Sequence, residues 1–388
     1  MEVDFISILF IMTHIVDYYL NPNNKILGED RWMVADRKYN YFSQYMLFEE
    51  NISGIDDHLR RIVCGWFSDP HSVFRAYVPP GGRSFRYDRT STAILSDRFL
   101  RRVDIISIEE VERYAINQNA TAVLFYTNRG LCLCCHHLFF DGVKAYNLIQ
   151  EVFDHDHKFK VENFAYIPLV HEIGLLLNSG HYLFPSQRYL TYDVEYKETS
   201  DYRPLRMRHR LSVYKDIKQR CTTKVAFTSV FISKMLRYIF RSTGVAFLSF
   251  GVLVGMNSKC RFNNYGVITC EMSRPGKDEG STAYAMRVHK TIERRKEMAV
   301  ASFIGSNIHG MDMKYGEIDI LFSGMPMTLD KQISIAGSRL KTVESNMRYT
   351  SMPIYCGYLS CDRYVHIYLN VRTDMVGVSE LAQIMGAR

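Results

Sequence analysis

A pair of adjacent histidines stands where a strand-like hairpin gives way to a helix, within residues 120–153. Residues 120–126 form a short apolar run, residues 127–130 (TNRG) are typical of a tight turn, and residues 131–137 (LCLCCHH) form the return run. After Asp141-Gly142, residues 143–153 place apolar side chains at helical spacing. This segment predicts two paired strands and a helix, joined by a turn that carries the histidines.

The two histidines cannot have the same surroundings, because side chains alternate between the two faces of a strand. His137 shares a face with Leu133 and Cys135, whereas His136 shares the other face with Cys132 and Cys134. We therefore expect the two imidazole rings to have different roles.

Strand-like and helix-like runs alternate along the rest of the chain, which predicts an α/β or α+β layered fold. The strand-like runs are residues 45–49, 72–78, 247–255, 318–322 and 364–371. The helix-like runs are residues 55–67, 168–177, 228–240 and 378–385, and a further helix opened by a capping box at Ser107–Glu110. The polar stretch of residues 181–204 is the expected connection between two halves.

Composition limits the class of protein. The chain has 388 residues, 47% of them hydrophobic, and a formal net charge of +7, which suits a globular protein of two or more domains. The basic excess accompanies no long basic run and no nucleic-acid-binding motif, so we expect no nucleic-acid partner. Nine cysteines are too few for a disulfide scaffold and predict free thiols in a reducing compartment, so we expect a cytoplasmic protein.

The apolar segment at residues 5–16 is too short to span a membrane and lacks the basic start of a signal peptide. We expect it to be a buried element of the fold and predict no transmembrane segment.

The cysteines and histidines of residues 132–137 do not have the spacing of metal ligands, and neighbours on a strand point in opposite directions. We predict no metal site there. Cys135 and His137 share a face but lie about 7 Å apart, too far for the hydrogen bond of a nucleophile–base pair.

The sequence from His136 to Gly142 (HHLFFDG) resembles the HHxxxDG motif of the chloramphenicol acetyltransferase-like superfamily of thioester-dependent acyltransferases. In that superfamily the motif also follows a hairpin and precedes an amphipathic helix. The order of other segments agrees: residues 55–78 are similar to an early helix and strand, residues 250–265 to a strand and basic loop, and residues 320–326 to a later strand.

The resemblance implies that His137, the second histidine, is the general base that removes a proton from the attacking group, as a side chain with a near-neutral pKa can do. His136 is implied as a supporting residue. Ser323, which follows a buried run, is the candidate hydroxyl donor to the oxyanion of the tetrahedral intermediate. A backbone N–H near Gly142 is the alternative donor.

The same resemblance implies that Asp141 points away from the substrate and pairs with a basic residue of a second-lobe loop. Arg261 is the first candidate for this partner and Lys259 the second. Gly142 lets the backbone turn tightly into the following helix. Asp141 and its partner would hold the turn that aims the catalytic histidine.

The implied architecture is two lobes, each a mixed β-sheet flanked by helices, with an active-site tunnel between them. We expect the first lobe at residues 1–185 and the second at residues 186–388, in a monomer. The implied reaction moves an acyl group from acyl-CoA, or from acyl-pantetheine on a carrier protein, to a hydroxyl or amine of a small molecule. The thioester is a co-substrate, and no permanently bound cofactor is implied.

Two alternatives stay open. The first is a carrier-protein-dependent condensation enzyme, and the second is a non-catalytic binding protein that keeps the fold. The DFGWG motif of plant acyltransferases is absent from the sequence, which argues against that subgroup. The basic run at residues 206–210 (RMRHR) either contacts the phosphates of CoA or protects an exposed strand edge.

Overall fold

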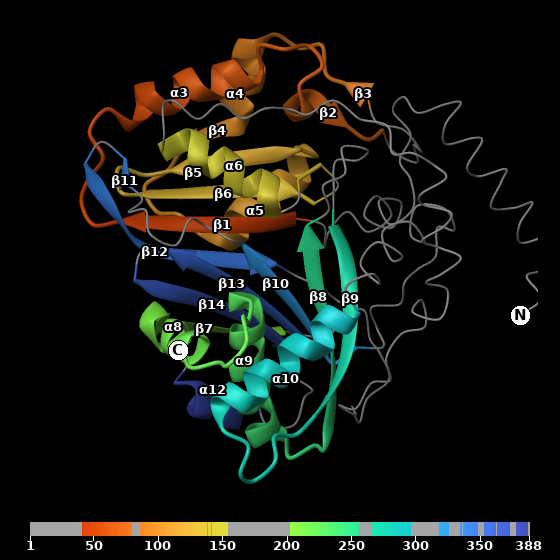
Figure 1. Cartoon of the computed structure of the whole chain (residues 1–388). Helices are drawn as coiled ribbons and strands as arrows, with labels where there is room; N and C mark the ends of the chain where they lie inside the picture. Colours follow the sequence, from red (N-terminus) through yellow and green to blue (C-terminus); the bar gives the residue numbers. More distant parts are fainter. Residues whose placement is uncertain are drawn as a thin grey trace, which may run out of the picture.

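The described part of the protein contains two six-stranded β-sheets, each with its own helices, and a small two-stranded sheet (Figure 1). The computed structural model describes residues 41–79, 86–137, 139–140, 142–153, 202–255, 265–295, 318–325, 334–335, 337–347, 353–361, 363–372 and 378–386. The mixture of sheets and flanking helices in two lobes confirms the predicted fold class. The runs at residues 5–16 and 168–177 lie outside the described residues.

The first sheet has the strand order β11-β12-β1-β6-β5-β4. Its strands are β1 (Tyr41–Phe48), β4 (Leu100–Arg102), β5 (Ala122–Tyr126), β6 (Gly130–His136), β11 (Ser334–Ile335) and β12 (Ser338–Met347). The other elements of this lobe are α3 (Ile55–Trp66), the 3₁₀-helix η1 (Val73–Arg75), the short strands β2 (Ala76–Tyr77) and β3 (Arg86–Tyr87), α4 (Thr92–Phe99), α5 (Ile108–Gln118) and α6 (Gly142–Phe153).

The β5–β6 hairpin is where the sequence places it, with Val123 opposite Cys134 and Phe125 opposite Cys132. Every residue of β6 is buried, because both faces of the strand are covered. Leu131, Leu133 and Cys135 join the core that includes α3 and α6, whereas Cys132 and Cys134 pack with Val111 and Ala115 of α5. The predicted alternation of side chains along this strand is therefore confirmed.

The capping box at residues 107–110 also opens a helix as predicted. The Ser107 hydroxyl accepts the backbone N–H of Glu110 at the start of α5. Asn119 ends the helix in the left-handed conformation, with a φ of 48°, which asparagine tolerates better than most residues.

The second sheet has the strand order β7-β14-β13-β10-β8-β9, with β8, β10 and β13 parallel to one another and the other pairs antiparallel. Its strands are β7 (Tyr202–Arg210), β8 (Phe247–Gly255), β9 (Tyr265–Ser273), β10 (Ile320–Met325), β13 (Ile354–Cys361) and β14 (Tyr364–Arg372). Its helices are α8 (Leu211–Gln219), α9 (Phe227–Thr243), α10 (Ser281–Arg294) and α12 (Val378–Met385).

Helix α9 covers one face of this sheet and supplies much of its core. Phe231 and Leu236 of α9 are fully buried beside Phe250 and Phe322 of the sheet. The helix ends at Gly244, whose φ of 72° is accessible to glycine at little cost. The opposite face of the sheet is turned to the first lobe.

The two lobes share one apolar core. Leu321, Tyr355 and Tyr368 of the second sheet belong to the same buried cluster as Phe42 and Phe140 of the first lobe. Helix α6 also contacts β10. The end of β6 and the start of α6 therefore lie in the lobe that packs against this face of the second sheet.

The lobes are not contiguous halves of the sequence. Strand β12, from the second half, pairs with β1 through contacts such as Met46 opposite Val343, and β11 extends the same sheet. The boundary expected between residues 185 and 186 lies outside the described residues and stays a prediction. However, strands β11 and β12 come from beyond that boundary in the sequence and belong to the sheet of the first lobe.

The strand expected at residues 72–78 is wrong for its first half. Residues Val73–Arg75 form η1, capped by Ser72, and only Ala76–Tyr77 is strand. The reason is the buried Arg75, whose guanidinium donates to the carbonyl oxygens of Phe67 (2.6 Å) and Thr90 (2.8 Å). Burial of the Arg75 guanidinium would be costly without hydrogen-bond acceptors, and the turn at η1 places the guanidinium among these carbonyl oxygens.

None of the helices in the described part of the chain combines the length and apolar character needed to cross a membrane.

Candidate active site

His136 is the last residue of β6 and His137 directly follows it, and their rings lie on opposite sides of the first sheet. The His136 ring stands edge-on to Tyr41, with 4.8 Å between ring centroids, and the His137 ring packs against Phe42 at 5.3 Å. Tyr41 and Phe42 are consecutive residues of β1, and they belong to the clusters on opposite faces of the sheet. His137 therefore lies on the side of the shared core, as the alternation in the sequence predicts.

Both histidines are more than nine-tenths buried, yet the chain turns directly after them. The His136 carbonyl accepts the backbone N–H groups of Phe139 (3.1 Å) and Phe140 (3.2 Å). Phe139 and Phe140 are side chains of the shared core, and Phe140 packs on Phe74 at 5.4 Å. These two rings anchor the turn from which Gly142 begins helix α6.

The residues predicted to hold the turn that carries His137 lie outside the described residues. These residues are Asp141, Lys259 and Arg261, so the pairing of Asp141 with either base stays a prediction.

Ser323 is a half-buried residue of β10, on the face of the second sheet that is turned to the first lobe. Its neighbour on that face, Leu321, is in the shared core, whereas Ile320 and Phe322 pack on the other side with α9. The ring of Tyr355 lies close to Gly357 of β13, the residue directly opposite Ser323 in the parallel pair. Each of the two proposed functional side chains, His137 and Ser323, thus adjoins residues of the shared core.

Tyr355 is the residue of this group that the sequence did not indicate. It lies in β13, directly beside Leu321 of β10, and burial raises its pKa above the ordinary value. Residues 354–357 could have indicated it, because side chains alternate between the two faces of a strand. Ile354 and Cys356 pack on one face of β13, and Tyr355 packs on the other, in the shared core.

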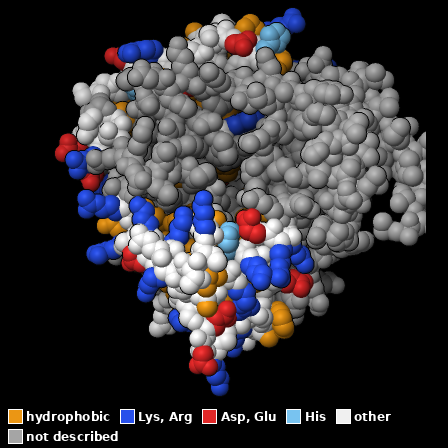
Figure 2. Space-filling view, viewed as in Figure 1, with side chains coloured by type: hydrophobic (Ala, Val, Ile, Leu, Met, Phe, Trp, Pro, Cys, Tyr) orange, Lys and Arg blue, Asp and Glu red, His pale blue; other side chains and the backbone are white. Residues whose placement is uncertain are grey.

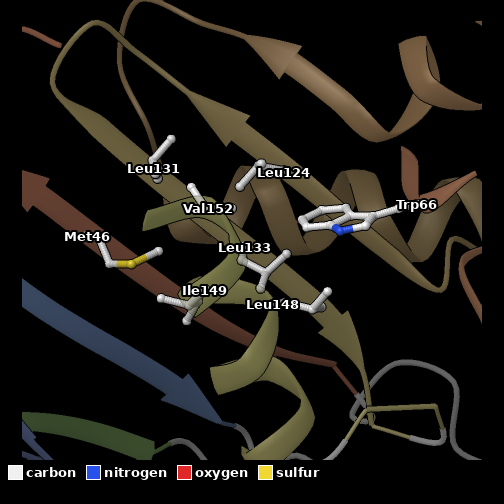
Figure 3. A pocket seen from close by; sticks show the side chains of 8 residues that line it. All are labelled: Met46, Trp66, Leu124, Leu131, Leu133, Leu148, Ile149 and Val152. Carbon is white, nitrogen blue, oxygen red and sulfur yellow. The ribbon is translucent and has the colours of Figure 1, made fainter. Parts of the chain in front are cut away.

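A small cavity lies inside the first lobe (Figure 3). It has room for about one water molecule at most. All its walls are apolar: Met46, Trp66, Leu124, Leu131, Leu133, Leu148, Ile149 and Val152. We interpret it as a packing gap between the sheet and α6. The tunnel expected between the lobes stays a prediction.

The cysteines near the histidines are packing residues. Burial raises the pKa of Cys134 and Cys135 well above the usual range, so both stay as thiols. Within the described residues, no three His, Cys, Asp or Glu side chains are grouped as a metal site would require.

The basic run at residues 206–210 forms part of β7, an edge strand among the described residues. Arg206 pairs with Glu344 of β12 at 2.9 Å, and the Arg208 guanidinium lies over the ring of Tyr364 at 3.8 Å. Figure 2 shows Lys and Arg side chains spread over much of the visible described surface of the second lobe. The run therefore lies on an edge strand of the described sheet, and both the protective role of its charges and its contact with CoA stay predictions.

The two lobes, their sheets and the shared core are those of the chloramphenicol acetyltransferase-like fold in its condensation-domain form. The condensation domain of the monacolin K polyketide synthase MokA has a TM-score of 0.65 and 11% identity over 93% of this chain and 96% of that domain. A variant of the starter condensation domain of rhizomide synthetase RzmA, in complex with C8-CoA, also has a TM-score of 0.65, with 10% identity over 95% of this chain and 94% of that one.

The epimerization domain from the third module of tyrocidine synthetase B has a TM-score of 0.62, with 11% identity over 94% of this chain and 95% of that domain. No protein-family model and no curated protein matches the sequence. The resemblance drawn from the sequence is confirmed at the level of the fold.

Proposed function

We propose that this protein is an acyltransferase, which moves an acyl group from a thioester to an amine or a hydroxyl with His137 as the general base. The observation that carries the proposal is the position of His137. It directly follows the fully buried strand β6, beside the core shared by the two lobes, in a chain with the fold of condensation domains.

The proposed chemistry needs a base and an oxyanion donor. The acceptor nitrogen or oxygen attacks the carbonyl carbon of the thioester while the imidazole of His137 takes its proton. The carbonyl oxygen becomes an oxyanion, to which the Ser323 hydroxyl donates. The intermediate then expels the sulfur, which receives the proton from the imidazolium, and the products are an amide or ester and a free thiol.

Acyl-CoA is the proposed donor. The support is that starter condensation domains of the same fold have been crystallised with C8-CoA. The surplus of basic residues, +7 over the chain, suits an anionic donor but is too small to specify one.

A carrier-protein-bound donor or acceptor is the second candidate. One observation favours it: a variant of the rhizomide synthetase domain is bound to both C8-CoA and Leu-SNAC. SNAC, N-acetylcysteamine, reproduces the thiol end of a pantetheine arm. An acceptor that is itself an aminoacyl thioester therefore belongs in any substrate panel.

The test is release of free thiol from acyl-CoAs of increasing chain length, in the presence of alcohols, amines and aminoacyl-SNAC thioesters. We expect turnover by the wild type and a loss of about 10²–10⁴-fold in His137→Ala, the usual contribution of a general base. His289→Gln, which changes a half-buried histidine of α10 in the second lobe, is the matched control and keeps the wild-type rate.

Two results would contradict the proposal. Equal rates for the wild type and His137→Ala would remove His137 from the chemistry. Stoichiometric binding of acyl-CoA by the wild type with no thiol release from any donor would favour a non-catalytic binding protein.

A further inference from the structure

The basic excess of the chain is concentrated in one segment of the second lobe, residues 202–224, which contains β7 and α8. This segment has eight Lys and Arg residues and one acidic residue, Asp216, so its formal net charge is +7. The whole chain also has a net charge of +7, so the rest of the sequence contains equal numbers of basic and acidic residues. We call the eight basic residues the basic band: Arg203, Arg206, Arg208, Arg210, Lys215, Lys218, Arg220 and Lys224.

Every side chain of the basic band is exposed. The apolar residues between them point the other way and pack with α9 in the core of the second lobe: Leu205, Met207, Leu211, Tyr214 and Ile217. The alternation along β7 and the helical spacing along α8 therefore turn the charges outward. Figure 2 shows Lys and Arg side chains gathered around the position at which Figure 1 shows β7 and α8.

Much of this charge is not neutralised by the protein itself. Arg206 pairs with Glu344 of β12, and the Arg208 guanidinium lies over the ring of Tyr364. Four other members of the band take part in no ion pair within the described part of the chain: Arg203, Arg210, Lys218 and Lys224. Their charge is available to an external anion.

The extent of the band favours a large partner over a small ligand. Arg203 and Arg210 are seven residues apart on one strand, a distance of about 23 Å, and the band continues along α8 to Lys224. The phosphates of one CoA molecule cannot lie along the whole of this length. Protection of an edge strand accounts for the charges on β7, but not for those that follow it.

We propose that the basic band binds the surface of an anionic lipid bilayer and that the protein associates with such membranes from one side. A bilayer presents negative head groups over any area, so it can meet an extended row of charges without a shaped pocket. Val213 of α8, which is 36% exposed among these charges, is compatible with a membrane interface. No nucleic-acid-binding motif accompanies the band.

The proposed attraction is electrostatic. The apolar face of α8 is buried within the protein, so it is not available for insertion between lipids. Each Lys or Arg near an anionic bilayer is expected to strengthen binding about fivefold. Because the charges are exposed, salt should screen the attraction fully. The inference does not depend on the proposed acyl transfer.

The experiment is sedimentation of the protein with vesicles of phosphatidylcholine alone or with about one third phosphatidylserine. We expect the wild type to bind only the anionic vesicles and to be released at about 1 M NaCl, where the Debye length is about 3 Å. The test variant is Arg203→Gln/Arg210→Gln/Lys218→Gln/Lys224→Gln, which leaves the Arg206–Glu344 pair in place. Its affinity for the anionic vesicles is expected to fall several-hundred-fold, about fivefold for each of the four charges.

The matched control removes the same charge from the first lobe. It replaces four exposed arginines with glutamine, none of which is in an ion pair within the described ranges: Arg61, Arg86, Arg89 and Arg113. This variant is expected to bind the anionic vesicles like the wild type. Thermal unfolding of both quadruple variants is expected to give the wild-type Tm, which shows that each is folded.

Several results would overturn the proposal. Equal losses in the two quadruple variants would show that net charge, and not the basic band, controls binding. A wild type that ignores the anionic vesicles, or binds neutral vesicles equally well, would also contradict it. Binding of CoA or of single-stranded DNA that is lost in the band variant, without binding to vesicles, would assign the band to a small ligand or to nucleic acid. Thiol release that depends on His137 is measured separately, so the proposed function and this inference can fail independently.

Discussion

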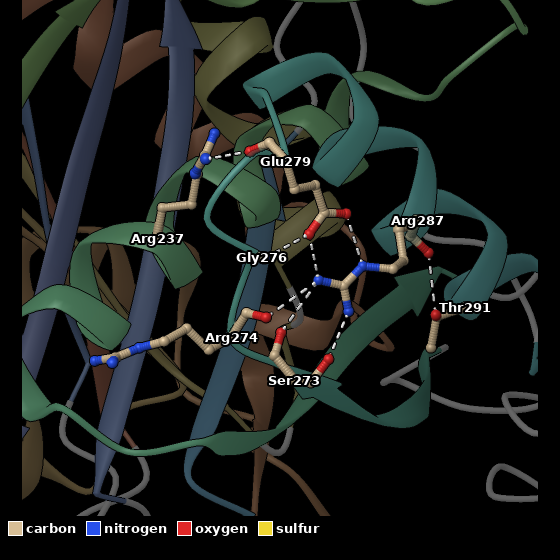
Figure 4. Close-up of polar contacts among 7 residues, drawn as sticks. All are labelled: Arg237, Ser273, Arg274, Gly276, Glu279, Arg287 and Thr291. Carbon is tan, nitrogen blue, oxygen red and sulfur yellow. Dashed lines mark hydrogen bonds and ion pairs between the residues drawn. The ribbon is translucent and has the colours of Figure 1, made fainter.

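At the scale of single residues, Arg287 of α10 takes part in a dense group of polar contacts in the second lobe (Figure 4). Its guanidinium makes a bidentate contact with the Glu279 carboxylate, at 2.9 and 2.7 Å, and donates to the Ser273 hydroxyl at 2.8 Å. Glu279 also accepts the Gly276 N–H at 3.1 Å. Together these contacts close the loop that leads from β9 into α10.

This pair predicts a stability change with a defined pH window. The hydrogen bonds from Arg287 are the main reason that the pKa of Glu279 is held below its ordinary value of 4.5. A carboxyl with a lowered folded pKa stabilises the protein above its unfolded pKa and loses that contribution as pH falls through the folded value. We expect Glu279→Gln to lower the free energy of unfolding by about 1–2 kcal/mol at pH 7, because both groups keep some contact with solvent.

Urea unfolding at a series of pH values checks this. The difference between the wild type and Glu279→Gln is expected to shrink below pH 4.5. Asp278→Asn, an exposed change in the same loop, is the control. A difference that is the same at pH 7 and pH 3 would show that Glu279 acts through packing and not through its charge.

At the scale of elements, β7 and β14 form an antiparallel pair that carries two half-buried histidines. His209 of β7 approaches the Tyr214 hydroxyl at 2.6 Å and lies near Lys234, and His366 of β14 lies beside Arg208. Burial, with the neighbouring positive charge as the second cause, lowers the pKa of each histidine to about 4. Both rings are therefore neutral in the folded protein at pH 7.

These two neutral histidines predict that the protein loses stability in mildly acidic solution. The unfolded chain binds a proton at each histidine near pH 6.5, whereas the folded chain does not until about pH 4. Stability therefore falls as pH drops between these values. We expect a loss of about 1–3 kcal/mol in the free energy of unfolding between pH 7 and pH 4.5, after allowance for partial exposure.

The double variant His209→Gln/His366→Gln is expected to flatten this slope, as measured by urea unfolding. The window lies above that of Glu279, so the two effects can be separated. A slope that is unchanged in the double variant would assign the acid sensitivity to other groups.

At the scale of the whole molecule, the two lobes form one cooperative structure. Their apolar core is shared, and β12 of the second half completes the first sheet beside β1. Neither sheet can lose its structure without exposing apolar surface of the other. We therefore expect unfolding in a single transition, although the chain has two lobes.

Buried thiols in each lobe can test this. Cys134 in the first sheet and Cys356 in the second are both fully buried. Pulse alkylation across a urea series, with mass spectrometry of the labelled peptides, is expected to give one midpoint for both thiols. Cys64 is exposed and reacts without urea, which controls for the reagent. Two separate midpoints would show that the lobes unfold independently.

The features that could be predicted are those whose cause is local in the chain. The β5–β6 hairpin, the opposite faces of His136 and His137, and helix α9 depend on turn residues, alternation and helical spacing within short segments. The strand expected at residues 72–78 is partly η1, because the carbonyl groups that surround Arg75 come from other segments. The alternation of side chains within a short segment cannot indicate contacts with residues that are distant in the sequence.

The candidate site shows the same division. The sequence by itself determined the histidine pair, its place at the end of a buried strand and the face on which His137 lies, because strand geometry alone decides them. Only the tertiary structure decided that β12 returns to pair with β1 and that the ring of Tyr355 lies over Gly357, opposite Ser323. These contacts depend on the register between strands, and the packing of whole sheets sets that register, not the residues next to them in the chain.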